Sequence, residues 1–386
     1  MHVVIRLHCG FGTAALSLFL LACGDGGGRD TAATGPAGLT GLGGTKGDDP
    51  NAMDEGGTTA GFEDDDGESG TPVGVKFDVG YGGTSDEVED TCGTECECET
   101  PEHVPCDAGG SDLFNAIGLN CVGEPQVTTS TSGPITAMGV RTGFGNTNTW
   151  APTEGAKFAV IGSGFISDLD LATPPGDSDV GPTHCNDDIG NFDPGGTLPA
   201  PLRVNDVGAV DCVADPTLVG TGDCSNTIAG QFSQGSSAND YVEMRIELDV
   251  PPDVISISYD FAFFTTEWPF YASSGYNDMY VGWLESENWT GNISFDTAGN
   301  PISLNAGFLD YTDQGGGLPE FAGTCMARHA GTGWLSTTVG VTPNEHITVV
   351  FAIFDLSDSI LDSYAFIDNF VLGCDPQIGP TTQPEG

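Results

Sequence analysis

The chain has 386 residues and a formal net charge of −47, because 56 Asp and Glu residues face only 9 Lys and Arg. Such a charge repels nucleic acids and anionic lipid surfaces, so it excludes nucleic-acid binding. The 58 glycines and 24 prolines oppose helix formation and argue against a helical bundle. Hydrophobic residues make up 38%, enough for one sizeable core, and we expect part of the chain to be disordered.

Residues 1–22 predict an export signal of the lipoprotein type. Arg6 gives a weakly basic start, and the apolar stretch Phe11–Ala22 is too short to span a bilayer. The stretch ends in Leu20-Leu21-Ala22-Cys23, which resembles a bacterial lipobox. We therefore expect lipid attachment at Cys23 and a location at the outer membrane or cell surface of a bacterium. An ordinary signal peptide with a chance cysteine is the alternative.

Residues 23–105 predict a disordered, acidic, Gly-rich linker that ends in a cysteine cluster. Apolar residues are sparse up to about Thr91, and Glu63–Gly67 is an acidic run, so the segment is typical of a flexible, self-repelling spacer. Its glycine-rich stretches follow no apolar strand and open no helix, which argues against phosphate-binding loops.

Ten cysteines remain when Cys9 of the signal and Cys23 are set aside, and an even number in an exported chain indicates disulfides. The first four have a spacing that a metal site could use. Export and the acidic residues between them favour disulfides, since like charges raise thiol pKa values. Connectivity stays open, with Cys212 and Cys224 as the best local pair. The ten are Cys92, Cys96, Cys98, Cys106, Cys121, Cys185, Cys212, Cys224, Cys325 and Cys374.

The second half of the chain predicts β-strands. Tyr241–Val250 alternates apolar and polar residues, and Ile255–Phe263 carries apolar residues at every second position. Turn-forming residues separate these segments, and the one candidate helix is short, at Ser111–Leu119. We expect an all-β fold, a jelly-roll-like antiparallel β-sandwich over residues 106–375, followed by a disordered tail at 376–386. Further strands are expected at Met279–Leu284, Ile347–Phe354 and Tyr364–Leu372.

Several segments, in the same order along the chain, resemble choice-of-anchor L domains. Thr265–Phe270 running into Gly275–Asp278 is similar to the family signature EEYPEF…GFND. The resemblance implies an exported surface protein, and the family offers no catalytic residues to carry over. Family members differ in their anchors, and this chain ends without an apolar tail, so the N-terminal lipid would replace a C-terminal anchor. Other matching segments, some typical of myxobacterial members, are Asp112–Leu119, Asn292–Asp296, Gly299–Asn305, Gly331–Leu335 and Leu361–Phe370.

The sequence shows no pattern of a known catalytic apparatus. No histidine stands in a metalloprotease-type H-E-x-x-H motif, and Gly162-Ser163-Gly164 is not a nucleophile elbow. Glu267 is the best single candidate for a catalytic carboxylate, because it lies between Phe263-Phe264 and Trp268. A hydrogen-bond acceptor in a loop is the simpler interpretation. We expect no enzymatic activity, and a secreted hydrolase acting on extracellular polysaccharide or protein is the alternative.

An aromatic stretch between two strands provides a candidate ligand surface. If exposed, its rings would stack on sugars; if buried, they would close one end of the sandwich, which we expect because aromatic residues add large apolar areas to cores. We expect a function in adhesion, matrix structure or surface binding, with an extracellular polysaccharide or a surface protein as partner. Contact with the membrane is expected only through the lipid. The candidate ligand residues are Glu267, Trp268, Tyr271 and Tyr276, with Phe270 between them.

Acidic residues near strand ends predict a structural calcium site. A carboxylate among apolar neighbours, such as Asp368, is costly unless it is paired, hydrogen-bonded or metal-bound, and only two arginines lie beyond residue 241. An exported chain meets calcium at concentrations that weak oxygen sites can use. We predict Asp278, Asp362 and Asp368 as ligands, with Asp355 and Asp358 nearby. Alternatively, Asp368 accepts hydrogen bonds from the backbone and an Asn side chain without an ion.

Overall fold

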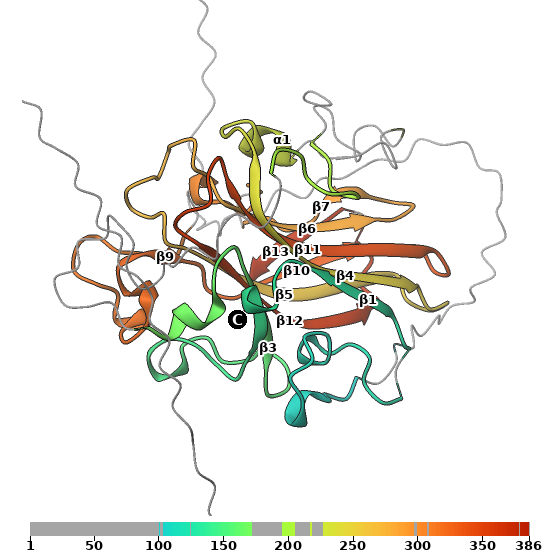
Figure 1. Cartoon of the computed structure of the whole chain (residues 1–386). Helices are drawn as coiled ribbons and strands as arrows, with labels where there is room; N and C mark the ends of the chain where they lie inside the picture. The colour runs from blue at the N-terminus through green and yellow to red at the C-terminus, as the bar shows by residue number, and fades with distance from the viewer. Residues whose placement is uncertain are drawn as a thin grey trace, which may run out of the picture. The chain divides into compact units, whose positions relative to one another are not determined.

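Two antiparallel β-sheets pack face to face as a sandwich in the computed structural model (Figure 1). The structure describes residues 100, 103–123, 125–171, 195–204, 217, 227–296, 299–306, 309–377 and 379–385, all within one unit that spans residues 86–386. The predicted signal peptide, Cys23 and nearly all of the predicted linker lie outside these residues.

The first sheet has five strands in the order β1-β4-β11-β6-β7, and every neighbouring pair is antiparallel. Its three central strands match the strands predicted at Tyr241–Val250, Ile347–Phe354 and Met279–Leu284, which are thereby confirmed. The bounds are β1 (Thr128–Ser132), β4 (Ala238–Asp249), β6 (Met279–Glu285), β7 (Thr290–Asn292) and β11 (His346–Leu356).

The second sheet has eight strands, six of them in the order β13-β10-β5-β12-β3-β2, while β9 pairs with β5 and β8. β13 falls in the segment expected to be a disordered tail. Its threonines are β-branched residues that suit an edge strand, and the Thr382 hydroxyl lies 2.8 Å from that of Thr337 on β10. The bounds are β2 (Met138–Arg141), β3 (Phe158–Gly162), β5 (Ser256–Thr265), β8 (Tyr311–Thr312), β9 (Ala330–Gly331), β10 (Leu335–Gly340), β12 (Ser363–Gly373) and β13 (Thr381–Pro384).

The main core lies between the sheets and follows the predicted alternation. Val242, Met244 and Ile246 of β4 point into it from the first sheet. Tyr259 and its neighbours at every second position of β5 face them, and the ring of Tyr259 lies 4.7 Å from that of Phe351. Each fully buried side chain of this size contributes roughly 1.5–3 kcal/mol to stability relative to exposure.

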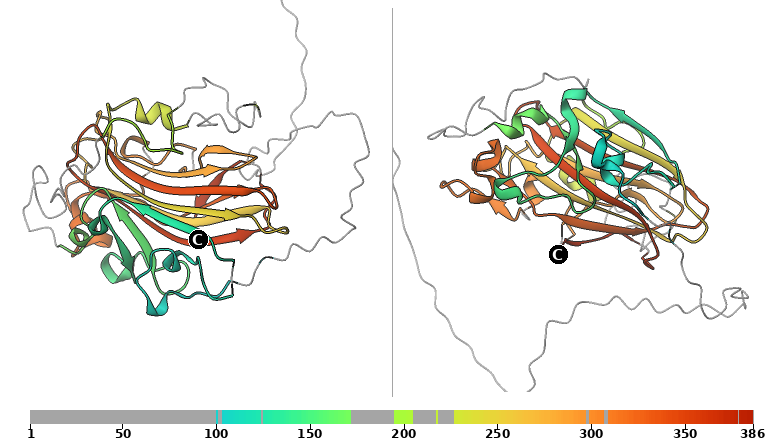
Figure 2. Two further views of the ribbon diagram at one scale, coloured as in Figure 1. Left: turned by 45° about the vertical axis from the view of Figure 1, so that its right-hand side comes forward. Right: turned by 90° about the horizontal axis from the view of Figure 1, so that it is seen from below.

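Both outer faces of the sandwich are also apolar and covered. Phe264 and Phe366 on the second sheet pack beneath Phe144 and Trp150, and the ring of Trp150 stacks on that of Phe321 at 4.6 Å. Two loops therefore lie side by side at one end of the sandwich, coloured green and orange in Figure 2. The first sheet is covered by α1 (Thr227–Phe232) and residues 198–202. This double covering explains why β5 is apolar at consecutive positions from Phe261 to Phe264, which face the main core and the outer layer in turn.

Short helical turns connect the strands, and no helix in the described residues is long and apolar enough to cross a membrane. The helix predicted at Ser111–Leu119 is reduced to one 3₁₀ turn, because Gly118 adopts a left-handed conformation (φ 87°) and ends it. The turns are η1 (Asp107–Gly109), η2 (Asn115–Ile117), η3 (Ile135–Ala137), η4 (Asn146–Asn148), η5 (Ile166–Asp170), η7 (Leu304–Ala306), η8 (Pro319–Phe321) and η9 (Cys325–Arg328).

One disulfide joins Cys106 to Cys121 and closes a short loop at the start of the described domain. Cys325 and Cys374 each take part in a disulfide with a cysteine outside the described residues. The proposed pair Cys212 and Cys224 lies outside the described residues, as do Cys92, Cys96, Cys98 and Cys185.

The Cys106–Cys121 bond gives a first testable prediction. Replacing both cysteines by serine should lower the free energy of unfolding by about 3 kcal/mol, because the bond restricts a loop of about 15 residues in the unfolded chain. Urea denaturation monitored by tryptophan fluorescence measures the change. Val122→Ala, at a fully solvated neighbouring position, is the control and should change stability by less than about 0.5 kcal/mol. Equal stability of the double variant and the wild type would contradict the prediction.

Candidate functional site

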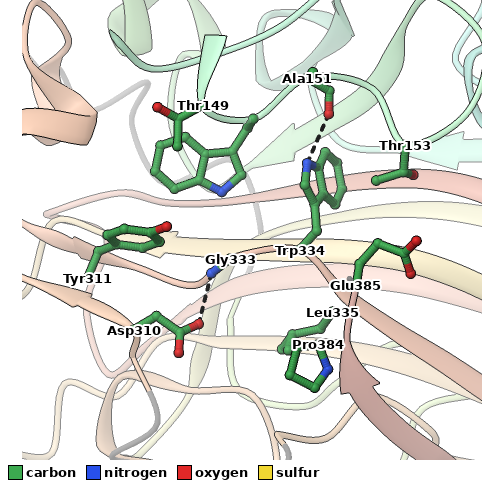
Figure 3. Close-up of a pocket in the computed structure, with 11 residues that line it drawn as sticks. Thr149, Ala151, Thr153, Asp310, Tyr311, Gly333, Trp334, Leu335, Pro384 and Glu385 are labelled. Atoms are coloured by element: carbon green, nitrogen blue, oxygen red, sulfur yellow. Dashed lines mark hydrogen bonds between the residues drawn. The ribbon is translucent and has the colours of Figure 1, made fainter. Parts of the chain in front are cut away.

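A pocket of about 770 Å³ lies where three segments distant in sequence come together (Figure 3). One wall is the loop Thr149–Thr153 before β3. The second is formed by Asp310 and Tyr311 with the segment Gly333–Leu335 that leads into β10. The third is the end of β13, at Pro384 and Glu385. Because β13 pairs with β10, the C-terminal strand brings its carboxylate beside Trp334.

Aromatic rings form the apolar part of this pocket. The half-buried Trp334 packs edge-on against Phe158 at 5.4 Å, and its indole Nε1 donates a 3.0 Å hydrogen bond to the carbonyl of Ala151. Tyr311 packs edge-on against Trp150 at 5.2 Å, and the indole of Trp150 donates to the carbonyl of Thr332. The ring planes are therefore fixed before any ligand arrives.

The polar groups of the pocket are acidic or neutral. Figure 3 shows Asp310 and Tyr311 on one side of Trp334 and Glu385 on the other. Asp310 accepts a 2.9 Å hydrogen bond from the amide of Gly333. Partial burial raises the pKa of the Tyr311 hydroxyl, and nearby acids, Asp310 among them, add to the rise. None of the described residues that line the pocket is Lys, Arg or His, so these residues offer hydrogen-bond acceptors and repel anions.

The predicted aromatic stretch forms a loop between β5 and β6, and the expected burial is wrong for two of its rings. Phe270 is 50% and Tyr276 38% exposed, and Tyr276 packs edge-on against the half-buried Tyr271 at 5.3 Å. Trp268 is half-buried, and its indole donates a 3.1 Å hydrogen bond to the carbonyl of Asp313. The loop projects these rings outward, while its backbone is held by the Asn305 side chain at Ser273 and Ser274 and by the Ser357 hydroxyl at Gly275.

Glu267 does not share the surface of that loop. Its side chain is 1% exposed, and one carboxylate oxygen accepts a 3.4 Å hydrogen bond from the amide of Asp278. Burial, followed by the charge of Asp278, raises the pKa of Glu267 to about 11, so it carries a proton at neutral pH. The structure therefore groups Glu267 with buried acids and separates it from Tyr271 and Tyr276.

Two of the three predicted calcium ligands, Asp278 and Asp362, lie at one end of the sandwich, and the third does not join them. Asp368 lies six residues beyond Asp362 on β12, about 20 Å away along an extended strand. Its carboxylate accepts hydrogen bonds from the amides of Thr153 at 2.7 Å, Glu154 at 3.2 Å and Asn369 at 2.8 Å. One ion cannot bind all three acids. The backbone part of the hydrogen-bonded alternative holds for Asp368, whereas the side-chain amide of Asn369 donates to Asp260 instead.

The surroundings of Asp368 predict a pH dependence of stability. Burial raises its pKa to about 7, well above the ~3.9 of an unfolded aspartate. The folded protein then binds this proton more tightly than the unfolded chain, so the carboxyl favours folding at low pH. This contribution is lost as the pH rises from about 4 to 7.

Urea denaturation of the wild type and Asp368→Asn across this pH range tests that expectation. The free energy of unfolding should fall more steeply with pH in the wild type, because asparagine does not titrate. Parallel profiles would show that Asp368 is not the titrating group.

Three pocket residues, Tyr311, Trp334 and Glu385, were not predicted as ligand residues. Trp334 lies in the segment Gly331–Leu335, which carries part of the family resemblance. That resemblance was the one feature of the sequence that could have pointed to Trp334. Glu385 stands in the expected tail, and Tyr311 gains its place only through the pairing of β8 with β9.

No family model matches the chain, and a search of curated proteins finds no significant match to it.

Proposed function

We propose that this protein is a non-enzymatic, lipid-anchored cell-surface module of the choice-of-anchor L type that binds an extracellular polysaccharide in the Trp334 pocket. The observation that carries the proposal is the pocket's composition: fixed aromatic rings beside acidic acceptors, with no basic side chain. A surface role in adhesion or matrix structure follows from such binding.

The strand order supports a jelly-roll assignment within the sandwich. In the second sheet β10-β5-β12-β3 are neighbours, and in the first sheet β4-β11-β6-β7 are neighbours. From β3 to β6, and again from β10 to β12, consecutive long strands alternate between the sheets, as in two interleaved Greek keys. Jelly rolls occur in lectin domains, although a fold by itself does not determine a function.

The pocket chemistry matches a neutral or amino-bearing sugar. A pyranose ring presents C–H groups on its face and hydroxyl donors at its rim. The electron-rich face of Trp334 attracts the C–H groups, while Asp310 and Glu385 accept hydrogen bonds from the hydroxyls. An amino group on the ligand would be attracted by both carboxylates. An anionic polymer would be repelled by the chain's net charge of −47.

Binding is favoured over the alternative of a secreted hydrolase by the position of the acids. Glycoside hydrolysis uses two carboxyl groups that flank the scissile bond. Glu267, the best catalytic candidate in the sequence, is buried and does not line the pocket that contains Trp334.

The predicted anchor and spacer complete the proposed architecture. A lipid on Cys23 would hold the chain at a membrane, and a flexible spacer over residues 23–105 would extend about 50 Å as a random coil. The binding module could then reach a polymer beyond the membrane surface while staying tethered.

Lipid attachment is tested with Cys23→Ser. We expect the wild type in the membrane fraction with the mass of an acylated N-terminal cysteine, and the variant in the soluble fraction without that mass. Cys9→Ser, in the part that would be removed, is the control and should remain membrane-bound. Continued membrane retention of Cys23→Ser would contradict the anchor.

Polysaccharide binding is tested by co-sedimentation of the mature protein with insoluble neutral polysaccharides and chitin, followed by a glycan array. We expect Trp334→Ala to weaken binding at least tenfold, since it removes the stacking surface. Glu385→Gln, at an exposed position that is not needed for folding, should weaken it several-fold. Tyr276→Ala on the separate loop should leave binding unchanged.

The controls separate the competing interpretations. Loss of binding in Tyr276→Ala with normal binding in Trp334→Ala would move the site to the loop. Release of soluble sugars by the wild type, abolished in Glu267→Gln, would instead support the hydrolase.

A further inference from the structure

Four acidic residues from four strands gather at one end of the sandwich, where the two sheets meet. Two belong to the ends of strands in the second sheet and two to the ends of strands in the first. Glu267 follows β5 and Asp362 precedes β12, while Asp278 precedes β6 and Asp355 is the penultimate residue of β11. We call these four residues the carboxyl cluster.

All four side chains are enclosed. Glu267 and Asp362 are 1% exposed, and Asp278 and Asp355 are fully buried. Asp278 lies at the centre, because its carboxylate accepts a 2.6 Å hydrogen bond from the Ser363 hydroxyl and a 3.3 Å bond from the Leu356 amide. Asp278 thereby contacts both sheets.

Asp355 is the unusual member of the cluster. Neither of its carboxylate oxygens has a hydrogen bond of good geometry, although both are fully buried. The Ser163 hydroxyl is close enough to lower its pKa, but burial and the charges of Asp278 and Asp362 outweigh that effect and raise the pKa well above the usual value. A buried acid in this state costs several kcal/mol unless something else neutralises it.

No basic side chain of the described residues supplies that neutralisation. Arg141 pairs with Asp170, Arg245 with Glu243 and Arg328 with Asp313. The groups that shift the pKa values of Glu267, Asp278 and Asp355 include further acids and hydroxyls but no Lys, Arg or His.

We propose that a calcium ion binds in the carboxyl cluster, with Asp278 and Asp355 as its anionic ligands. Two carboxylates balance the charge of one divalent ion, and the ion contacts the oxygens of Asp355, to which Ser163 and Asp278 lie close without a hydrogen bond of good geometry. This site goes beyond the proposed polysaccharide pocket and does not depend on it.

The donor atoms select calcium over other metals. Every polar side chain of the cluster ends in oxygen, whereas zinc prefers histidine nitrogen and cysteine sulfur. Among the described residues, no group of three His, Cys, Asp or Glu side chains is arranged to hold a metal ion. The remaining ligands are therefore neutral oxygens, for which the Ser163 and Ser363 hydroxyls are placed. Calcium accepts such mixed, irregular oxygen sets, while magnesium requires a near-ideal octahedron.

The position of the site suggests what the ion stabilises. Glu267 and Asp278 bracket the loop that exposes Phe270 and Tyr276, so an ion bound to Asp278 fixes the end of that loop. Asp355 and Asp362 bracket the crossing from β11 to β12. Asp362 lies so close to the backbone of Gly164 that a Cβ there would lie 1.7 Å from its carboxylate. The ligands Asp278 and Asp355 both come from the first sheet, and the ion reaches the second sheet through the hydroxyls of Ser163, after β3, and Ser363 of β12.

Calorimetric titration of the chelator-treated mature protein with calcium chloride tests the proposal, together with melting temperatures in EDTA, calcium and magnesium. We expect one site with a dissociation constant at or below the millimolar range. The melting temperature should rise by several degrees in 10 mM calcium and much less in magnesium.

Asp355→Asn keeps the size of the side chain and removes its charge, so it should weaken calcium binding at least tenfold. Asp368→Asn, also a buried acid but distant on β12, is the matched control and should bind like the wild type. The many exposed acids of the chain bind calcium weakly and to the same extent in all three proteins. Comparison with Asp368→Asn therefore removes this background binding.

Three outcomes would overturn the proposal. One is a wild type that neither binds calcium nor changes its melting temperature. Another is equal binding by Asp355→Asn and the wild type. A third is that calcium does not change the melting temperature of the wild type and that Asp355→Asn is more stable than the calcium-free wild type. That result would show that the acids are neutralised by shared protons. If Asp355→Asn fails to fold, Asp278→Asn and the calcium content of the dialysed wild type decide the question.

Discussion

The burial of Glu267, Asp278 and Asp355 among further acids is the constraint on which the closed end of this sandwich depends. Four strands end at the carboxyl cluster, and the backbone there is arranged around Asp278, which takes hydrogen bonds from β11 and β12. No Lys, Arg or His of the described residues is among the groups that shift the pKa values of these three acids, so their charge is neutralised by protons or by the proposed ion.

The second determinant is the apolar outer face of the eight-stranded sheet. A sheet with an apolar face must be covered, and here Phe144, Trp150 and Phe321 cover it from loops that lie far apart in the sequence. Their packing fixes the loops beside β10 and leaves Trp334 half-buried at the margin. The pocket is thus a consequence of how the covering layer ends, which gives it rigid walls without dedicated helices.

The sequence predicted the central strands well because their period-two pattern is strong. The alternate residues of β4 and β5 face the core as expected, namely Val242, Met244, Ile246 and Leu248 on β4 and Ile257, Tyr259, Phe261 and Phe263 on β5. The sequence did not predict the edge strands and the loops, because their conformation and exposure depend on residues that are distant in the sequence. Strand β13 has almost no apolar signal of its own and forms because β10 offers an unpaired edge. The exposure of Phe270 was likewise hidden, since an aromatic residue in a loop carries no periodicity that tells inside from outside.

The same argument explains the mixed outcome for the acids. When one acid stands on the strand face that is otherwise formed by apolar residues, the pattern predicts that the acid is buried, and Asp368 is buried. The pattern does not show which groups approach the acid from other strands. The amides of Thr153 and Glu154, more than two hundred residues earlier, satisfy Asp368. Asp355 has the same local signal, yet the second sheet brings it acids instead of amides. The burial of an acid can therefore be predicted from the sequence of its own strand. Its hydrogen-bond partners depend on which other strands the fold places beside it. Only those partners distinguish a structural carboxylate from a metal ligand.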